Sequence, residues 1–197
     1  MNIVKTLRKL TETPGPSGFE GPIATAVHDL WQPLVDEISR DYVGSLVATK
    51  RGSGDAPRPR ILLAAHMDEI GLLVSQVVDH KGSGFLRVTN LGGVDRRHLY
   101  GQLVTIHGKR DLTGVIGALP KSMLPDNRGS GIYTYEEFVV DPGLPYAELN
   151  ELVSIGDAVT FRQSLRKMQG KVVSAKAMDN RASVTAVTVC LDHLQSR

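Results

Sequence analysis

Apolar residues near the N-terminus recur with the period of an α-helix. A first helical stripe consists of Val4, Leu7 and Leu10. The turn-forming stretch PGPSG, residues 14–18, then interrupts the pattern. A second stripe consists of Ile23, Val27, Leu30, Trp31 and Leu34. Two start signals fit this second helix equally well: a capping box of Ser17 and Glu20, or Gly21 as the cap with Pro22 at the first helical position.

Two strand candidates follow the helices, joined by a loop. Residues 45–50 form the first candidate, and residues 51–60, RGSGDAPRPR, have the glycine, proline and charge content of a loop. Residues 61–65 are apolar throughout, as expected of a parallel strand that helices cover on both faces. The order of helix, strand, loop and buried strand indicates an α/β sheet.

The middle of the chain has a different texture, with short β-branched segments separated by turn residues, which is typical of antiparallel sheet. The expected strands are residues 72–78, 85–89, 102–107 and 113–119. Residues 146–152 suit one short helix, and a strand at 172–175 followed by a C-terminal helix restores the α/β pattern. The sequence therefore predicts a discontinuous α/β domain, residues 1–71 with 164–197, and an inserted small β domain, residues 72–163.

Composition narrows the class of protein. Lysine and arginine total 23 against 21 aspartates and glutamates, which gives +2 and does not suggest a nucleic-acid surface. The single cysteine, Cys190, excludes an internal disulfide and fits a reducing compartment, and we expect it to be an inert core thiol. No apolar run approaches the ~20 residues that span a bilayer, and no signal-peptide block is present. We expect a cytoplasmic protein with no nucleic-acid or membrane partner.

Ionisable side chains follow two of the expected strands. The stretch AAHMDEIG, residues 64–71, brings His66 and Asp68 to one strand end, and Asp179 follows another. Ligands of open α/β sheets bind at such ends, and imidazole and carboxylate are usual ligands of zinc, cobalt or manganese. The alternatives are a surface turn, since turns are rich in aspartate, and, for Asp179, a plain helix N-terminus. Glu69 is interpreted as a turn carboxylate, and four histidines are expected at the surface: His28, His80, His98 and His107.

Several segments of the chain resemble the M42 family of metallo-aminopeptidases, which includes glutamyl and deblocking aminopeptidases. They are PGPSGFE at 14–20, DYVGSLVATKRG at 41–52, AAHMDEIGLLV at 64–74, SIGDAVTF at 154–161 and KAMDNRASV at 176–184. These segments occur in the family's order and spacing over the whole chain. Ser45 departs from the asparagine usual in the family, but it lies away from the metal motifs.

The resemblance implies an aminopeptidase that uses two divalent metal ions, zinc or cobalt, to activate water for attack on a peptide carbonyl. It makes His66 a ligand of one metal and Asp179 the carboxylate that bridges both. It makes Asp68 a catalytic residue, the acid that orients His66. The implied fold is a metallopeptidase-type α/β sandwich, incomplete here, with the β insertion as a PDZ-like domain.

The resemblance also implies partners, namely peptides with a free N-terminus and further copies of the chain. The PDZ-like domain would mediate dimer contacts that build a larger assembly. Edge strands, which a small β domain must cover, favour such self-association as well. We therefore expect a homo-oligomer.

Family members are much longer than this chain. They carry a Glu-Glu pair, a further ligand aspartate and a late ligand histidine, none of which can be assigned before Arg197. We therefore expect an N-terminal portion of the enzyme with an incomplete site, inactive by itself. Two alternatives remain open: a non-catalytic oligomerisation fragment, or a glycoside hydrolase, which needs two carboxyls flanking a sugar. Asp68 and Glu69 fit that need poorly, because adjacent residues on a strand end point in different directions.

Overall fold

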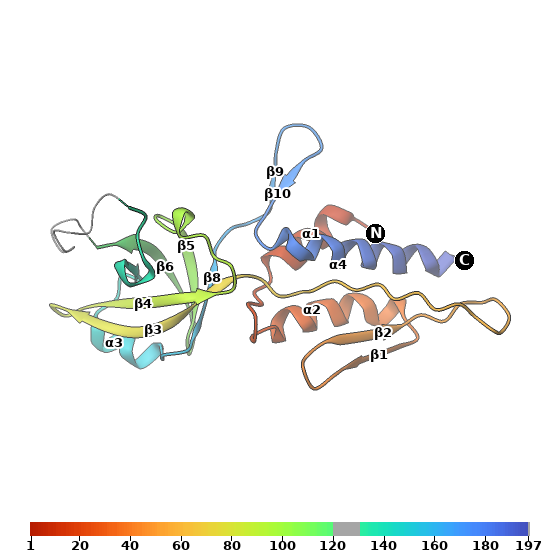
Figure 1. Cartoon of the computed structure of the whole chain (residues 1–197), viewed down its shortest axis with the longest axis horizontal. Helices are drawn as coiled ribbons and strands as arrows, with labels where there is room; N and C mark the ends of the chain where they lie inside the picture. The colour runs from red at the N-terminus through yellow and green to blue at the C-terminus, as the bar shows by residue number, and fades with distance from the viewer. Residues whose placement is uncertain (120–130, 197) are drawn as a thin grey trace. The chain divides into compact units, whose positions relative to one another are not determined.

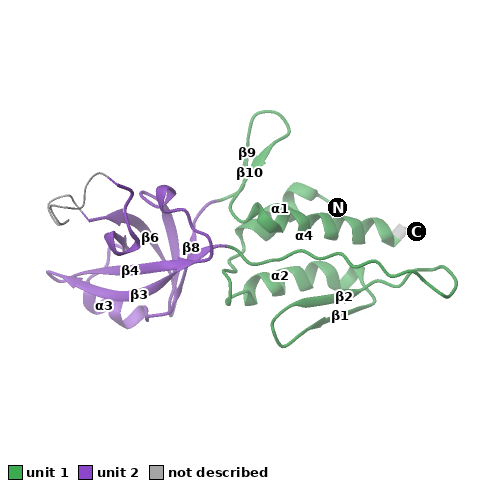
Figure 2. Ribbon diagram, viewed as in Figure 1, with its two compact units in different colours: residues 1–69, 164–197 green, residues 70–163 purple. Residues whose placement is uncertain are grey.

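The computed structural model describes residues 1–119 and 131–196, and the chain forms two compact units (Figures 1 and 2). Unit 1 comprises residues 1–69 and 164–197, and unit 2 comprises residues 70–163. Unit 1 is therefore discontinuous, and unit 2 is inserted into it. Within residues 1–119 and 131–196, no helix combines the length and apolarity that crossing a membrane requires.

Three helices of unit 1 pack around one apolar core. They are α1 (Ile3–Glu12), α2 (Gly21–Trp31) and α4 (Met178–His193). Their shared core consists of Leu10, Ile23, Ala26, Val27 and Val184. Both N-terminal helices form where the apolar period predicts them. Cys190 of α4, however, is exposed rather than a core thiol, because the helix turns this position away from the core.

The start of α2 differs from both expected capping arrangements. Glu20 is the N-cap residue and makes no side-chain capping bond, while Pro22 lies in the first turn. The Ser17 hydroxyl instead donates to Asp68, far along the chain. The capping box therefore does not form, because the Ser17 hydroxyl is hydrogen-bonded to Asp68 instead of to the helix backbone.

The strands of unit 1 pair only as two short hairpins among the described residues. β1 (Glu37–Arg40) pairs antiparallel with β2 (Leu46–Thr49), and β9 (Arg166–Lys167) pairs antiparallel with β10 (Val173–Ser174). The β9–β10 hairpin projects beyond the helices in Figure 1. Two 3-10 helices complete the unit, η1 (Gln32–Leu34) and η6 (Leu194–Ser196). Unit 1 thus combines helices with strands, as an α/β fold does, without the expected covered sheet.

The predicted buried strand at residues 61–65 is wrong in the structure described here. The segment is extended but carries no strand pairing. Ile61 and Leu62 are 86% and 90% exposed, whereas Ala65 and Met67 pack partly against the unit 1 core. An apolar run becomes a core strand only where neighbouring strands and covering helices exist. Here no described element covers its first half.

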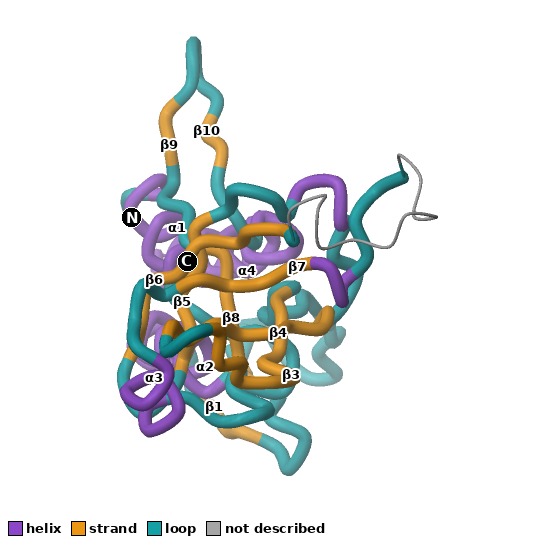
Figure 3. The backbone as a smooth tube through the Cα atoms, turned by 90° about the vertical axis from the view of Figure 1, so that its left-hand side faces the viewer, coloured by secondary structure: helices purple, strands orange, loops and turns teal. Residues whose placement is uncertain are grey.

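Unit 2 is a closed antiparallel barrel with strand order β3-β4-β7-β6-β5-β8. Its strands, drawn in orange in Figure 3, are β3 (Gly71–His80), β4 (Ser83–Leu91), β5 (Leu103–His107), β6 (Asp111–Ala118), β7 (Phe138–Asp141) and β8 (Ala158–Phe161). In the described part of unit 2 they are accompanied by one helix, α3 (Tyr146–Leu152), and two 3-10 helices, η2 (Arg96–His98) and η5 (Tyr135–Glu137). The antiparallel β texture read from the sequence is confirmed in these elements.

Local chemistry explains the longest hairpin of the barrel. His80 pairs with Ser83, so Lys81 and Gly82 form a two-residue turn. Both have positive φ, 53° and 86°, as a type I′ turn demands. A register shift between Val74 and Gln76 marks a bulge in β3. Bulges bend and twist a strand, which helps a sheet to curve into a barrel.

Closure of the barrel changes the argument for self-association. Inward-facing residues such as Leu86, Ile106 and Phe138 are fully buried and fill the interior. In the closed barrel each strand pairs with a neighbour on both sides, although β3 pairs with β8 only at Leu72 and Leu73. Exposed strand edges therefore give less support to self-association than the sequence alone suggests.

Candidate metal centre

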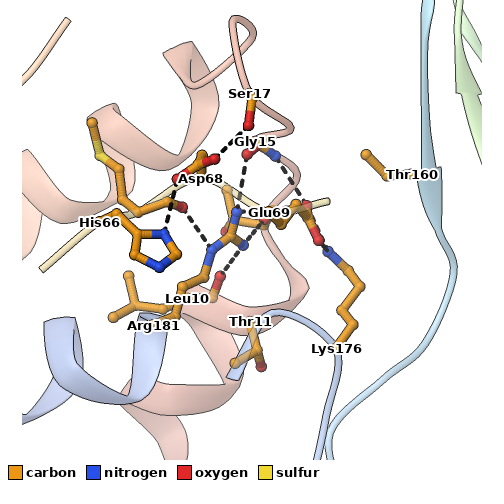
Figure 4. Close-up of polar contacts among 12 residues, drawn as sticks. Leu10, Thr11, Gly15, Ser17, His66, Asp68, Glu69, Thr160, Lys176 and Arg181 are labelled. Carbon is orange, nitrogen blue, oxygen red and sulfur yellow. Dashed lines mark hydrogen bonds and ion pairs between the residues drawn. The ribbon is translucent and has the colours of Figure 1, made fainter. Parts of the chain in front are cut away.

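His66 and Asp68 lie on the extended segment that leads out of the unit 1 core. The His66 Nδ1 atom lies 2.9 Å from Asp68 Oδ1, and the Ser17 hydroxyl donates to the other carboxylate oxygen (Figure 4). Partial burial alone would raise the pKa of Asp68, but the hydrogen bonds of Ser17 and His66 outweigh it and lower that pKa below 3.8. Asp68 is therefore ionised at neutral pH and accepts the Nδ1 proton.

Asp179 reaches the same place from the start of α4. The backbone there is irregular: Ala177 has a left-handed φ of 54°, and Asp179 and Asn180 are non-helical. This geometry places Asp179 Oδ1 3.1 Å from His66 Nε2. Two residues that are 113 positions apart in sequence thus meet at one point. The structure brings together the three residues that the sequence singles out.

The contacts of this trio suit a cation. A protonated imidazole donates to both carboxylates, whereas the lone pair that a neutral imidazole carries on Nε2 would face a carboxylate oxygen of Asp179, which is also an acceptor. Two acceptors at this distance repel unless a cation, either a proton or a metal ion, lies between or beside them. Histidine nitrogen and aspartate oxygen are a zinc-type donor pair, so the residues fit a divalent metal.

The trio does not complete a metal site within the described ranges. Residues 1–119 and 131–196 contain no group of three or more His, Cys, Asp or Glu side chains that could hold a metal ion. His66 and Asp179 are also open to solvent, with side chains 53% and 93% exposed. A structural zinc site, by contrast, is closed and takes four ligands.

Glu69 is the residue that sequence reasoning missed. It was interpreted as a turn carboxylate, yet it is only 4% exposed. Lys176 donates to both of its carboxylate oxygens, at 2.9 and 2.6 Å, and the Gly15 amide donates to one of them at 3.1 Å. Its position directly after Asp68 and beside an apolar run was the available signal, but its partners come from distant segments.

Arg181 is the second buried charged residue behind the trio. Its side chain is fully buried and lies 3.5 Å from Glu69. Its guanidinium donates to backbone carbonyls of four residues: Leu10, Thr13, Gly15 and Met67. Burial lowers the pKa of Arg181 and of Lys176, and in both cases the negative charge of Glu69 acts in the opposite direction.

A cleft of about 220 Å³ lies beside the trio in unit 1. Trp31, Leu46 and Met67 contribute apolar side chains to it, and His66 and Asp68 line it as well. The cleft therefore places an apolar surface next to the candidate ligands.

Three of the other histidines, His80, His98 and His107, belong to unit 2. His107, in the wall of the barrel, is partly buried rather than a plain surface residue. Its ring contacts Asp111 at 2.8 Å and Thr160 at 2.9 Å. This contact ties neighbouring barrel strands together.

Comparison with known proteins shows the family of the chain. The sequence pattern of the M42 glutamyl aminopeptidase family matches residues 44–197. A protein of Acetivibrio thermocellus that carries an aminopeptidase name is 35% identical over 96% of this chain and 53% of its own length. The glutamyl aminopeptidase of Lactococcus lactis is 29% identical over 100% and 56%. The chain therefore spans about half the length of these relatives.

Solved structures show the same fold. The TET aminopeptidase of a marine sediment archaeon of the Thaumarchaeota superposes with a TM-score of 0.88 at 28% identity, covering 98% of this chain and 54% of that one. The TET1 peptidase of Pyrococcus horikoshii, which can assemble into a tetrahedron or a large octahedral shell, gives 0.80 at 34%, over 98% and 57%. An endoglucanase of Thermotoga maritima gives 0.78 at 32%, over 95% and 54%. With the family pattern covering most of its residues, this chain belongs to the M42 peptidase family.

Proposed function

We propose that this chain supplies His66 and Asp179 as ligands to the metal centre of an aminopeptidase that removes N-terminal residues from peptides. One observation carries the proposal: His66 Nε2 and Asp179 Oδ1, two atoms of the kind that bind zinc, lie 3.1 Å apart although 113 positions separate the residues in sequence. Membership in a peptidase family supports the reaction class independently.

The chain's own residues prepare this site before any metal binds. Asp68 accepts the Nδ1 proton of His66 and so keeps the Nε2 lone pair available, as carboxylates commonly do for ligand histidines. Asp179 offers two carboxylate oxygens and can bridge two ions. A pair of zinc or cobalt ions, when bound, would polarise the scissile carbonyl and lower the pKa of a water molecule.

A first experiment tests metal binding. Zn²⁺ is titrated into the protein while the imidazole C–H signals of its six histidines are followed by NMR. We expect the His66 signals to shift saturably and the His28 and His98 signals to stay in place. Asp179→Ala should abolish the shift, because only one ligand then remains. A His66 signal whose chemical shift does not change on addition of Zn²⁺ would show that the proposal is wrong.

A second experiment tests turnover. His66 and Asp179 provide two ligands where a zinc ion wants about four, and the described residues hold no cluster of three or more such side chains. The 197-residue chain should therefore bind metal weakly and hydrolyse no aminoacyl-p-nitroanilide. Cobalt-stimulated turnover that a chelator blocks and Asp179→Ala removes would reveal a complete site within these residues.

The barrel is proposed to mediate self-association, the role expected of a PDZ-like domain. The ability of the Pyrococcus horikoshii TET1 peptidase to form shells supports this assignment. Sedimentation velocity at micromolar concentration measures it directly. A concentration-independent monomer would contradict it.

Two other functions are weaker. A non-catalytic assembly fragment would bind no Zn²⁺ at His66, so the titration above distinguishes it. A glycoside hydrolase is favoured by the endoglucanase names that two of the similar structures carry. Glu69 is buried in ion pairs with Lys176, so it cannot face a sugar as a second catalytic carboxyl. Release of reducing sugar from a cellulose substrate would support the glycoside hydrolase hypothesis instead.

A further inference from the structure

A buried ionic cluster lies directly behind the candidate metal centre. It consists of Glu69, Lys176 and Arg181, and we call it the Glu69 cluster. The three side chains are at most 9% exposed. No buried side-chain nitrogen or oxygen in the described part of the chain lacks a hydrogen-bond partner, so the cluster is fully paired. Buried charges are uncommon and costly, so a complete network of this kind calls for a reason.

The cluster joins the two segments that carry the proposed ligands. Glu69 lies one residue after Asp68 and three after His66. Lys176 and Arg181 lie three residues before and two residues after Asp179, and both contact Glu69. Each proposed ligand therefore lies within three residues of a member of the cluster.

A third segment, the turn after α1, is clamped to both. The Glu69 amide donates to the Gly15 carbonyl at 3.0 Å, and the Ser17 amide donates to the Glu69 carbonyl at 3.3 Å. Arg181 donates at 3.0 Å to the Met67 carbonyl, which lies between His66 and Asp68 in the chain. Figure 4 shows Lys176 and Gly15 in contact with Glu69, and the Arg181 guanidinium beside the carbonyls of Leu10 and Gly15.

The ligands themselves cannot fix their own positions. His66 and Asp179 are mostly exposed, so little packing restrains either side chain. Metal ligation nevertheless tolerates errors of only about 0.2 Å in ligand distance. Asp68 orients the His66 ring through Nδ1, and the remaining restraint comes from the backbone on either side of each ligand, which is where the Glu69 cluster acts.

We infer that Glu69, Lys176 and Arg181 are positioning residues, which hold the His66 and Asp179 segments at the separation that binds a divalent metal. This inference rests on the proposed function. It assigns a role in metal affinity to three residues that touch neither metal nor substrate.

Charge and geometry make opposite predictions for Lys176. Lys176 is a cation near a cation site, so its removal should strengthen metal binding if electrostatic repulsion were its only influence. If it positions Asp179 through Glu69, its removal should weaken binding. The sign of the change therefore separates the two roles.

The experiment is the same Zn²⁺ titration on Lys176→Met, followed through the His66 imidazole signal. We expect the dissociation constant to rise about tenfold or more, the range typical when residues behind metal ligands are altered. Lys176→Arg keeps the ion pair with Glu69 and should restore most of the affinity. Lys50→Met is the matched control, since Lys50 is in the same unit and pairs with Asp36 at 3.9 Å, away from the cluster.

A charge-balanced variant guards against simple unfolding. Lys176→Met alone leaves Glu69 paired only with Arg181, which can destabilise the fold. Glu69→Gln with Lys176→Met removes both charges of the ion pair while conserving volume. Arg181 then loses Glu69 but keeps its backbone carbonyl acceptors, so we expect this double variant to keep the circular dichroism spectrum of the unaltered protein, with a lower urea midpoint, while its Zn²⁺ affinity falls by a similar factor.

The outcomes are distinct. Unchanged or tighter binding in a folded Lys176→Met or double variant overturns the inference while leaving the proposed function intact. Absence of Zn²⁺ binding at His66 in the unaltered protein overturns the proposed function, and this inference with it.

Discussion

Replacing Arg181 with methionine should be the most damaging single change in unit 1. The side chain is 0% exposed and donates to four backbone carbonyls from three segments. Hydrogen bonds from a charged donor contribute about 1.5–3 kcal/mol each. Their sum is an upper bound, because the Gly15 carbonyl also accepts from the Glu69 amide.

A better guide to the magnitude is the measured cost of removing one partner of a buried ion pair, about 3–5 kcal/mol. Domains have only about 5–15 kcal/mol of unfolding free energy in total. With an m-value of about 1.5 kcal/mol per molar urea, Arg181→Met should lower the unfolding midpoint of unit 1 by about 2 M or more.

Tryptophan fluorescence can follow unit 1 alone. Trp31 is the only tryptophan of the chain and donates to the Thr188 hydroxyl at 2.9 Å inside this unit. Arg51→Met is the control, because Arg51 pairs with Glu37 at the surface and such pairs contribute at most about 1 kcal/mol. A midpoint of Arg181→Met that matches the control would show that the carbonyls find other donors and that the reasoning is wrong.

Three further predictions concern acid stability, the exposed segment and the barrel. Because the pKa of Asp68 is lowered in the fold, its ionised form stabilises the protein above pH 3.8, and this stabilisation disappears as the pH falls through the folded pKa. Asp68→Asn should therefore be less stable than the unaltered protein at neutral pH, and urea titrations should show the gap closing below pH 3.8; a pH-independent gap contradicts this. Leu62→Lys should reduce ANS binding and aggregation while changing the unfolding free energy by less than about 0.5 kcal/mol, because Leu62 is exposed; unchanged aggregation would show that this segment is not responsible. Phe138→Ala should destabilise the barrel by about 3–5 kcal/mol, measured as faster hydrogen exchange in β6 and β7, because Phe138 is fully buried; a loss below about 1 kcal/mol would mean that the core closes around the cavity.

Much of the local structure could be predicted from the sequence, because apolar spacing and turn residues act over a few neighbouring positions. The helical spacing of apolar residues predicts α1 and α2, and β-branched segments with turn residues predict the barrel strands. The residues of the candidate site were also readable, since His66, Asp68 and Asp179 each follow an apolar run. Their motif-level resemblance to M42 peptidases agrees with the family match.

The sequence by itself thus determined the element types, the inserted β texture and the identity of the candidate ligands. Only the tertiary structure decided that residues 61–65 stay uncovered, that the inserted strands close into a barrel, and that Glu69 is buried with Lys176 and Arg181. The physical reason is the same in each case. Period and turn chemistry act over a few neighbouring residues, whereas burial, strand pairing and ion pairing depend on which distant segment arrives, and Glu69 meets Lys176 across 107 positions of chain.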